Sequence, residues 1–440
     1  MKTSLRLSVA VAAMMALSAC GIFKGGKAKT PVLGDRVPIL ASESSALADP
    51  SISAIEVVLP PATVNAEWSQ PGGNAAKSMG QLELGASPTR VWTAQIAGST
   101  QRARLAAAPI IAGGKLYVVD VNATVHSFDA ATGARGWSTE ISPGEENQQS
   151  RFGGGVSFED GKLYASSGLG DVVAINAADG AILWRKKPGG PLRGAPTIAN
   201  GNAYVLSQDN QLFALLLTDG SVQWNQSGSL ETQGVFGVAA PASAQGTVVA
   251  GFSSGELNAY RYENGRQLWQ DSLSRSSAST SVSSLADIDA APVIDQGRAY
   301  AVGQGGRMVA LELATGQRLW EQNFAGISTP WIAGEWLFLV TDDARLICIG
   351  RSNGKIRWIS QLKHWDNEKK RKGLVSWTGP VLAGNRLILL NSDGEMAFAS
   401  PTDGSVTSTM EAGKGFDLPP VVANSMLYTI DDEGRISAYR

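Results

Sequence analysis

The chain has 440 residues, 17% of them charged, and a formal net charge of −2. Because nucleic-acid binding calls for a clustered basic face, this balance argues against DNA or RNA as a partner. Its two histidines and two cysteines show no spacing typical of a zinc site. The length would fit two or three average domains, but a repeat that spans nearly all of the chain indicates one.

Residues 1–19 have the features of a signal peptide. Lys2 and Arg6 give a positive start, and the apolar stretch 7–17 is too short to span a bilayer stably. The following Leu-Ser-Ala-Cys20-Gly21 resembles a bacterial lipobox, in which Cys20 becomes the lipidated first residue of the mature protein. Gly21 at the next position suggests, again by resemblance, an outer-membrane destination. The alternative is an ordinary secretory signal with a chance cysteine.

Residues 20–66 contain few aromatic residues and several Gly, Ala, Ser and Pro runs. We interpret them as a lipidated N-terminus and flexible tether, with a short strand expected at residues 55–59. The second cysteine, Cys348, lies in an apolar stretch and has no partner once Cys20 is lipidated. It is therefore expected to be a small buried hydrophobe, without a disulfide.

The remaining residues, 67–440, carry a repeated unit. In each unit a Pro is followed 24 positions later by a turn Gly and four positions after that by Trp. The complete units are Pro109-Gly133-Trp137, Pro196-Gly220-Trp224, Pro241-Gly265-Trp269, Pro292-Gly316-Trp320 and Pro330-Gly354-Trp358. Two degenerate units keep the register, as Val156-Gly180-Trp184 and Pro380-Gly404-Ser408. Repeats of this period are typical of solenoids, propellers and arrays.

Each unit is predicted to form four short strands, because apolar and polar positions alternate between turns rich in Gly, Asp and Asn. Four strands in about 45 residues make one propeller blade. Seven units are followed by three further strands in residues 419–439, and Thr89–Ile96 offers the missing fourth strand with Trp92. We therefore predict an all-β, eight-bladed β-propeller with four antiparallel strands per blade, whose last blade is closed by an N-terminal strand. The periodic Trp residues are expected to pack between neighbouring blades.

Length variation is confined to one kind of connection. From the Trp position of one unit to the Pro position of the next, the spacings are 19, 12, 17, 23, 10, 22 and 12 residues. In a propeller these connections all emerge on one face, and variation confined to one face usually marks the binding face. The connections 225–240, 270–291 and 359–379 stand out, and the first two flank the same blade, so we expect them to be neighbours.

These connections hold the candidate binding residues. Phe236 is an aromatic residue in a loop, and Asp287 and Asp289 are two apart, so both face one side of an extended strand. By default we interpret this pair as a solvated edge, although acid–base chemistry or a metal would also use such a pair. An exposed Phe with paired carboxylates suits a protein partner. The basic run 363–372 is expected to be a solvated loop.

No catalytic motif is recognisable in the chain. The glycine-rich stretches 151–155 and 303–306 lack the strand-to-helix context of a phosphate- or dinucleotide-binding loop, and no nucleophile elbow occurs. The residues themselves therefore predict no enzyme activity, no cofactor and no metal site.

The blade pattern Ala-Pro … Gly-x-x-Tyr … Gly-x-x-x-Ala-Leu … Thr-Gly-x-x-x-Trp resembles that of pyrroloquinoline-quinone dehydrogenases over residues 67–440. Two kinds of protein carry it, the quinoprotein enzymes and the BamB lipoproteins of the outer-membrane β-barrel assembly (BAM) machinery. The lipobox, the opening Trp68-Ser-Gln-Pro-Gly-Gly-Asn and the segment 285–292 look like the BamB family. Quinoprotein dehydrogenases are usually longer, and many have adjacent cysteines near the cofactor.

The resemblance implies a non-catalytic scaffold, anchored in the outer membrane and facing the periplasm, without a cofactor and monomeric outside its complex. The implied partners are the POTRA domains of BamA, other BAM subunits and unfolded β-barrel proteins. In the family, an acidic pair matching Asp287 and Asp289 contributes to the BamA contact, as does a segment matching Gln233 to Gly237. Family members often have Leu-Arg where this chain has Val235 and Phe236, so the family's arginine is missing here. Despite this departure, Phe236 is expected to serve as an apolar anchor. The alternatives are a periplasmic quinoprotein dehydrogenase and a propeller scaffold of another envelope complex.

Overall fold

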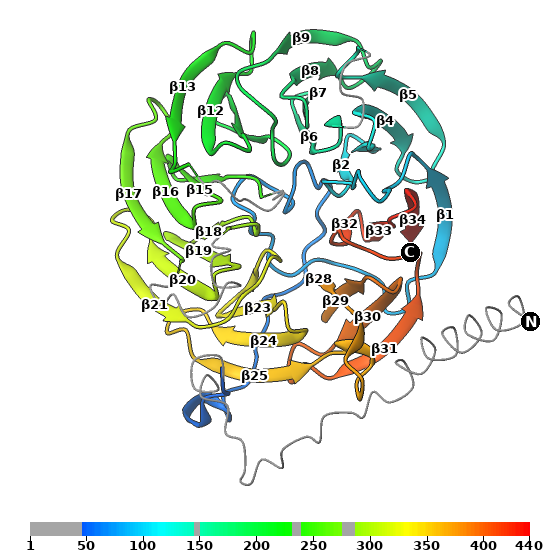
Figure 1. Ribbon diagram of the computed structural model, residues 1–440. Helices are drawn as coiled ribbons and strands as arrows, with labels where there is room; N and C mark the ends of the chain where they lie inside the picture. Colours follow the sequence, from blue (N-terminus) through cyan, green and yellow to red (C-terminus); the bar gives the residue numbers. More distant parts are fainter. Residues whose placement is uncertain (1–45, 145–149, 231–238, 275–286) are drawn as a thin grey trace, which may run out of the picture. The chain divides into compact units, whose positions relative to one another are not determined.

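The computed structural model describes residues 46–144, 150–230, 239–274 and 287–440. In this part of the chain, eight four-stranded antiparallel sheets are arranged as blades around a central axis (Figure 1). The predicted eight-bladed propeller is confirmed. One compact unit spans Ser45–Arg440.

Blades 1 to 4 follow one another in chain order. Their strands, from inside to outside, are β2 (Ile110–Ala112), β3 (Lys115–Val119), β4 (Thr124–Asp129) and β5 (Arg135–Glu140); β6 (Gly154–Glu159), β7 (Lys162–Ser167), β8 (Val172–Asn176) and β9 (Ile182–Lys186); β10 (Thr197–Ala199), β11 (Asn202–Leu206), β12 (Gln211–Leu216) and β13 (Val222–Ser227); and β14 (Ala242–Ala244), β15 (Thr247–Gly251), β16 (Glu256–Arg261) and β17 (Gln267–Ser272).

Blades 5 to 8 complete the ring, and a separate two-stranded hairpin lies between blades 6 and 7. The strands are β18 (Val293–Asp295), β19 (Arg298–Gly303), β20 (Arg307–Glu312) and β21 (Arg318–Gln322); β22 (Trp331–Ala333), β23 (Trp336–Val340), β24 (Arg345–Gly350) and β25 (Ile356–Gln361); the hairpin β26 (Trp365–Asn367) and β27 (Lys372–Leu374); β28 (Trp377–Ala383), β29 (Arg386–Asn391), β30 (Glu395–Ala399) and β31 (Val406–Glu411); and β32 (Val421–Ala423), β33 (Met426–Ile430), β34 (Arg435–Tyr439) and β1 (Arg90–Gln95).

The last blade is closed by β1, the N-terminal strand. It pairs antiparallel with β34, placing Thr93 opposite Ser437. Thr89 and Arg440 exchange two backbone hydrogen bonds of 2.8 and 2.9 Å just beyond this pairing. The predicted closure is confirmed, and it joins the two ends of the described chain in one sheet.

Neighbouring blades are joined by a contact that explains the repeat. The indole Nε1 of each outer-strand Trp donates a hydrogen bond to a backbone carbonyl of the next blade, as Trp224 does to Tyr262 at 2.8 Å. The turn Gly of that next blade lies against the indole ring. The Trp–Gly pairs are Trp92–Gly133, Trp137–Gly180, Trp184–Gly220, Trp224–Gly265, Trp269–Gly316, Trp320–Gly354 and Trp358–Gly404. The Trp residues therefore pack between blades, as predicted.

The junction between blades 7 and 8 lacks a Trp–Gly pair, and the connectivity of blade 8 explains why. Ser408, at the Trp position of blade 7, faces blade 8, whose outer strand comes from the N-terminus. Blade 8 therefore has no turn between its third and fourth strands and no glycine that could receive an indole. At this junction Arg90 and Tyr439 of blade 8 donate hydrogen bonds to the carbonyl of Ala412, at 3.0 and 3.3 Å.

The core lies between the blades and within them. Most second and third strands are buried along nearly their whole length, whereas outer strands alternate between exposed and half-buried positions. Cys348 on β24 is fully buried, as expected. No helix within the described residues is long and apolar enough to span a membrane.

Part of the expected tether is built into the fold. The short helix η2 (Pro50–Ile52) lies beside blade 6, where the backbone N–H of Asp49 donates to the carbonyl of Ile356 at 2.8 Å. The predicted strand at residues 55–59 was wrong, because these residues form no ladder with another strand. Residues that the sequence assigned to the tether, which was predicted to end at residue 66, therefore contact the propeller.

The Trp–Gly contact can be tested at Gly265. This residue has φ +69°, and a Cβ there would lie 2.7 Å from the ring of Trp224. We expect Gly265→Ala to destabilise the fold by about 1–3 kcal/mol through overpacking, in addition to its backbone cost. The matched control is Gly297→Ala, which has a similar φ of +74° and open space around the new Cβ. An equal loss of thermal stability in both variants would contradict the proposed role of the contact.

Candidate partner-binding face and central funnel

The order of antiparallel strands gives the propeller two distinct faces. Every connection from an outer strand to the next inner strand emerges on one face, which we call the crossover face. The hairpins between first and second strands emerge on the other face. The crossover face therefore carries all the connections of variable length, as the sequence predicted.

Among the described residues, one segment crosses the central channel near the opposite face. We call residues 63–84 the floor segment. It contacts the hairpins of that face, where Glu67 accepts a hydrogen bond from the N–H of Gly113 at 3.1 Å and Ser78 donates to Asp295 at 2.9 Å. In Figure 1 it is the blue chain that runs through the middle of the ring.

The floor segment hydrogen-bonds to every blade in turn. Its bonds run from Asn65 to Val422, Trp68 to Ile111, Ser69 to Phe158, Gln70 to Ile198, Ala75 to Ser243, Ala76 to Ile294, Gly80 to Trp331 and Leu82 to Leu382. Inner strands are sheet edges, with backbone N–H and C=O groups that need partners. The floor segment satisfies some of these groups and closes the channel.

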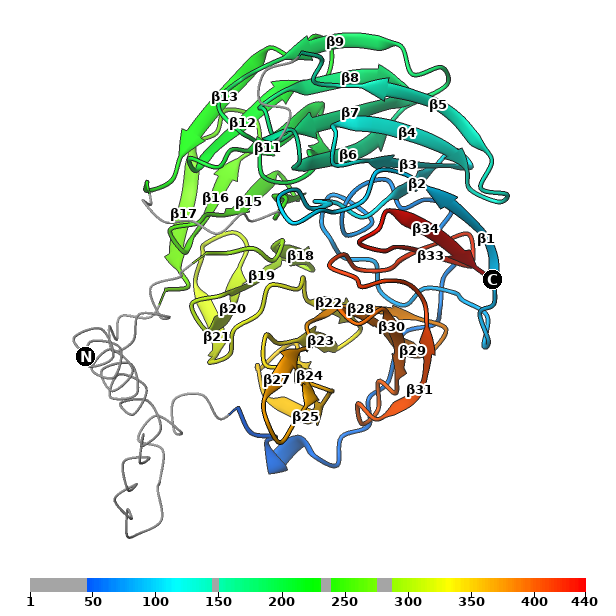
Figure 2. The same cartoon turned by 45° about the vertical axis from the view of Figure 1, so that its right-hand side comes forward.

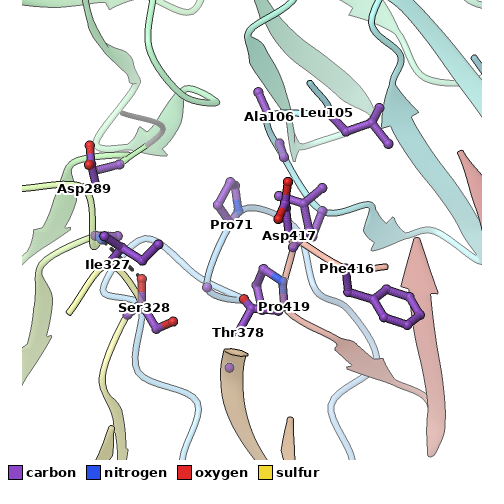
Figure 3. Close-up of a pocket in the computed structure, with 18 of the residues that line it drawn as sticks. Pro71, Leu105, Ala106, Asp289, Ile327, Ser328, Thr378, Phe416, Asp417 and Pro419 are labelled. Atoms are coloured by element: carbon purple, nitrogen blue, oxygen red, sulfur yellow. Dashed lines mark hydrogen bonds between the residues drawn. The ribbon is translucent and has the colours of Figure 1, made fainter. Parts of the chain in front are cut away.

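Above this floor lies a cavity of about 640 Å³. Its walls are formed mainly by the small residues and prolines that precede the inner strands, and by parts of the crossover connections. Figure 3 shows residues from several blades around the same space, among them Leu105, Asp289, Ser328 and Phe416. Because the floor segment closes the other end, the cavity is a funnel that opens on the crossover face.

Lys77 of the floor segment lines this funnel yet is almost completely buried. Its Nζ donates a hydrogen bond of 3.2 Å to Oγ1 of Thr197. No ion pair with a carboxylate is found for it among the described residues. Burial lowers the pKa of Lys77 to about 7, because the charged ammonium loses hydration.

The acidic pair of the fourth crossover is buried, not solvated. Asp287 and Asp289 are 1% and 9% exposed, and the Nη2 of Arg193 lies 2.7 Å from Oδ1 of Asp287 and 2.9 Å from Oδ1 of Asp289. Gln304 donates a further hydrogen bond of 2.7 Å to Oδ2 of Asp289. The default interpretation as a solvated edge was therefore wrong. Both carboxylates do face one side of the chain, as their spacing predicted.

This cluster ties together crossovers that flank two blades. Arg193 precedes the inner strand of blade 3, whereas Asp287 and Asp289 precede the inner strand of blade 5. One guanidinium faces two carboxylates, so burial and the neighbouring Asp287 charge raise the pKa of Asp289. Reversing both acids to Arg would bury three cations together, which disrupts packing as well as any surface contact.

The other predicted site residues cannot be placed. Gln233, Val235 and Phe236 lie in 231–238, and Cys20 lies in 1–45, which are outside the described residues. The described ends of the two crossovers around blade 4 lead into β14 and β18, and these two inner strands contact each other. This agrees with the expectation that these connections are neighbours.

Sequence reasoning missed three residues of this region. Lys77 and Arg193 belong to segments without any motif, and Gln304 lies in a glycine-rich turn. The only available signal was a charged residue within an otherwise small and apolar stretch, which is too common to be specific. No group of three or more His, Cys, Asp or Glu side chains that could hold a metal ion occurs in the described part of the chain.

Comparison with known proteins identifies the family. The family model described as "Outer membrane protein assembly factor BamB" matches residues 81–149 and 121–360, more than half of the chain. The chain belongs to this family. BamB of Yersinia pestis is 26% identical over 359 residues, covering 80% of this chain and 89% of the relative. BamB of Burkholderia pseudomallei is 27% identical over 362 residues, covering 80% and 87%.

Solved structures show the same fold. BamB from Moraxella catarrhalis has a TM-score of 0.67 at 18% identity, covering 80% of this chain and all of that one. A europium-containing methanol dehydrogenase has a TM-score of 0.66 at 14% identity, covering 82% and 89%. The enzyme and the assembly factor are thus similarly close in fold. The fold alone does not choose between them, whereas the family match does.

The buried acidic pair has a measurable pH signature. A carboxyl with a raised pKa holds its proton in the folded state at a pH where the unfolded chain has released it. Stability is then lost as pH rises from about 4 towards neutrality. We expect Asp289→Asn to remove this contribution, worth on the order of 1 kcal/mol. Denaturant titrations of both proteins at several pH values measure it, and parallel stability curves would contradict it.

Burial of Lys77 should make the stability of the fold depend on pH in the opposite direction. Its folded pKa of about 7 lies below the ordinary value of 10.5. The unfolded chain therefore binds more protons between these values, and stability rises with pH across that window. We expect Lys77→Met to remove a dependence of about 1 kcal/mol per pH unit above pH 7. Denaturant titrations from pH 7 to 9 test this, with Lys187→Met, an exposed residue, as the control.

Proposed function

We propose that this chain is a non-catalytic scaffold of the outer-membrane β-barrel assembly complex. The observation that carries the proposal is the family match over residues 81–360. The absence of a recognisable catalytic motif in the sequence is consistent with it. As a scaffold, the chain would work by holding binding loops in fixed relative positions.

The fold suits this role because the blades are firmly joined to one another, whereas the length variation is confined to the crossover connections. Trp–Gly contacts join seven of the eight blade junctions, and the floor segment hydrogen-bonds to the inner strands. The crossover connections are held at their bases and differ in length between blades. A partner that docks on the crossover face would therefore meet loops whose bases are held in fixed relative positions, which limits the ordering cost of binding at those bases.

We propose that the POTRA domains of BamA dock at the crossovers on either side of blade 4. Gln233, Val235 and Phe236 would supply the direct contact, with Phe236 as the apolar anchor. Asp287 and Asp289 would not touch the partner. Their ion pairs with Arg193 would hold the base of the fourth crossover, residues 270–291, in place. This assigns the acidic pair a positioning role and leaves the contact to the loops.

We propose further that Cys20 carries the lipid that anchors the chain to the outer membrane, with the propeller in the periplasm. Other subunits of the complex and unfolded β-barrel proteins are the remaining proposed partners. Client strands could add only to the outer edges of the blades, since the inner edges bond to the floor segment.

The docking proposal is tested by adding two carboxylates to the proposed contact. We expect Val235→Asp with Phe236→Asp to reduce the BamA recovered with the lipidated protein by at least about tenfold, as for the loss of a buried hot spot. Affinity purification from detergent-solubilised envelopes, followed by quantitative mass spectrometry, measures this recovery.

The matched control places the same substitutions on the rim, at Ile182 and Leu183 of β9, which are 40% and 50% exposed. The control should recover BamA normally. Equal recovery from all three proteins would contradict docking at this loop. Recovery of a different envelope complex would instead overturn the proposed function while leaving the fold unaffected.

A further inference from the structure

The hairpin β26–β27 is an insertion that follows the outer strand of blade 6. Two hydrogen bonds fix its base. Nε1 of Trp377 donates to the carbonyl of Lys363 at 2.8 Å, and the N–H of Val375 donates to the carbonyl of His364 at 3.0 Å. In its ladder Trp365 pairs with Leu374, and Asn367 pairs with Lys372. The basic run, expected to be a solvated loop, therefore lies in an exposed two-stranded hairpin, whose strand β27 is labelled in Figure 2.

The tip of this hairpin carries uncompensated positive charge. Its two acidic residues are engaged at the base, where Asp366 pairs with Lys363 at 2.9 Å and Glu368 accepts from the N–H groups of His364 and Trp365. Four consecutive cations are exposed and form no ion pair with any described residue. They are Lys369, Lys370, Arg371 and Lys372.

Apolar side chains accompany these cations. Leu374 is 59% exposed and lies opposite the half-buried Trp365. Indole and aliphatic groups next to Lys and Arg are the composition typical of segments that bind at the membrane–water interface.

The other end of the same outer strand carries the N-terminal segment. Lys355 pairs with Asp49 at 3.2 Å, and Nε of Arg357 donates to the carbonyl of Ile55 at 2.8 Å. This segment exposes three large apolar side chains, Leu47 at 74%, Ile55 at 50% and Val58 at 65%. The first described residues of the chain therefore lie at blade 6.

We propose that the rim of blade 6 faces the membrane and that the β26–β27 tip binds the phosphate groups of an anionic lipid surface. Six residues of β25, about 20 Å at ~3.3 Å per residue, separate the two membrane-directed segments. This inference rests on the proposed membrane anchoring, but it concerns a second contact that does not need the acyl chain. A basic patch at the rim would add an electrostatic contact with the lipid surface to the proposed anchor.

Charge and chain path favour a membrane over an acidic protein. The 25 residues between Cys20 and Ala46 reach at most about 90 Å, so an anchored Cys20 would allow this rim to touch the lipid surface. With the rim of blade 6 on that surface, the basic tip and the exposed apolar residues of the N-terminal segment would both face lipid. The propeller axis runs along the membrane plane in this arrangement, and the funnel opens sideways.

The test uses the full mature chain with Cys20→Ala, which removes the acyl group but not the rim. Its binding to phosphatidylglycerol-containing vesicles is measured by co-sedimentation at low and high salt. We expect Lys369→Gln, Lys370→Gln and Arg371→Gln together to weaken binding at least about tenfold, because each cation near an anionic surface contributes roughly fivefold. High salt should abolish the difference.

Blade 2 offers a matched control on the opposite rim. Arg185, Lys186 and Lys187 are likewise exposed, and their change to Gln removes the same three charges. This control should bind vesicles like the parent. Equal weakening in both triple variants, or no vesicle binding by the parent, would overturn the proposal. So would a hairpin variant that keeps vesicle binding but loses a protein partner, because the tip would then be a protein contact.

A second readout reports the orientation directly. A polarity-sensitive fluorophore on Leu374→Cys should brighten when anionic vesicles are added, whereas the same label on Leu183→Cys of blade 2 should not. Cys348 is fully buried and does not compete for the label. Equal responses at both positions would overturn the orientation. Neither result depends on BamA, so this test and the docking test fail independently.

Discussion

The contact between an outer-strand Trp and the turn Gly of the next blade is the constraint on which this structure depends. The indole needs a flat, open surface, and only a residue without a Cβ leaves room for it at a turn with positive φ. Its Nε1 hydrogen bond fixes the ring against the neighbouring backbone. Because both residues belong to the invariant part of the repeat, blade packing is set without any help from the crossovers, and these can vary.

Closure of the ring depends on the N-terminal strand β1, which completes blade 8, and on the floor segment. β1 supplies an outer strand with Trp92, so the junction from blade 8 to blade 1 has the ordinary contact. The junction without one, between blades 7 and 8, coincides with the place where blade 8 has no turn glycine to offer. The floor segment then bonds to the inner strand of each blade, which leaves the crossover face as the surface where backbone and side chains remain available.

The repeat made the blades, their number and the closing strand predictable, because Pro, Gly and Trp have strict local reasons to occupy their positions. The floor segment was not predictable, since its residues follow no period and bond mainly through backbone groups that every sequence possesses. Asp287 and Asp289 were found by spacing, yet their burial depends on Arg193, almost a hundred residues earlier in the chain. The role in outer-membrane protein assembly came from the family match. Loops that form an interface show no periodic sequence pattern from which their partner could be predicted.

Docking and membrane contact are compatible because they use different parts of one ring. The proposed BamA contact lies on the crossover face at blade 4, whereas the proposed lipid contact lies on the rim at blade 6, two blades away. A propeller resting on that rim would present its crossover face to the side, where a protein at the membrane surface can reach it. The insertion of β26–β27 at blade 6 would thus orient the docking face as well as add affinity for lipid. A lipid anchor at the end of a long linker cannot set that orientation.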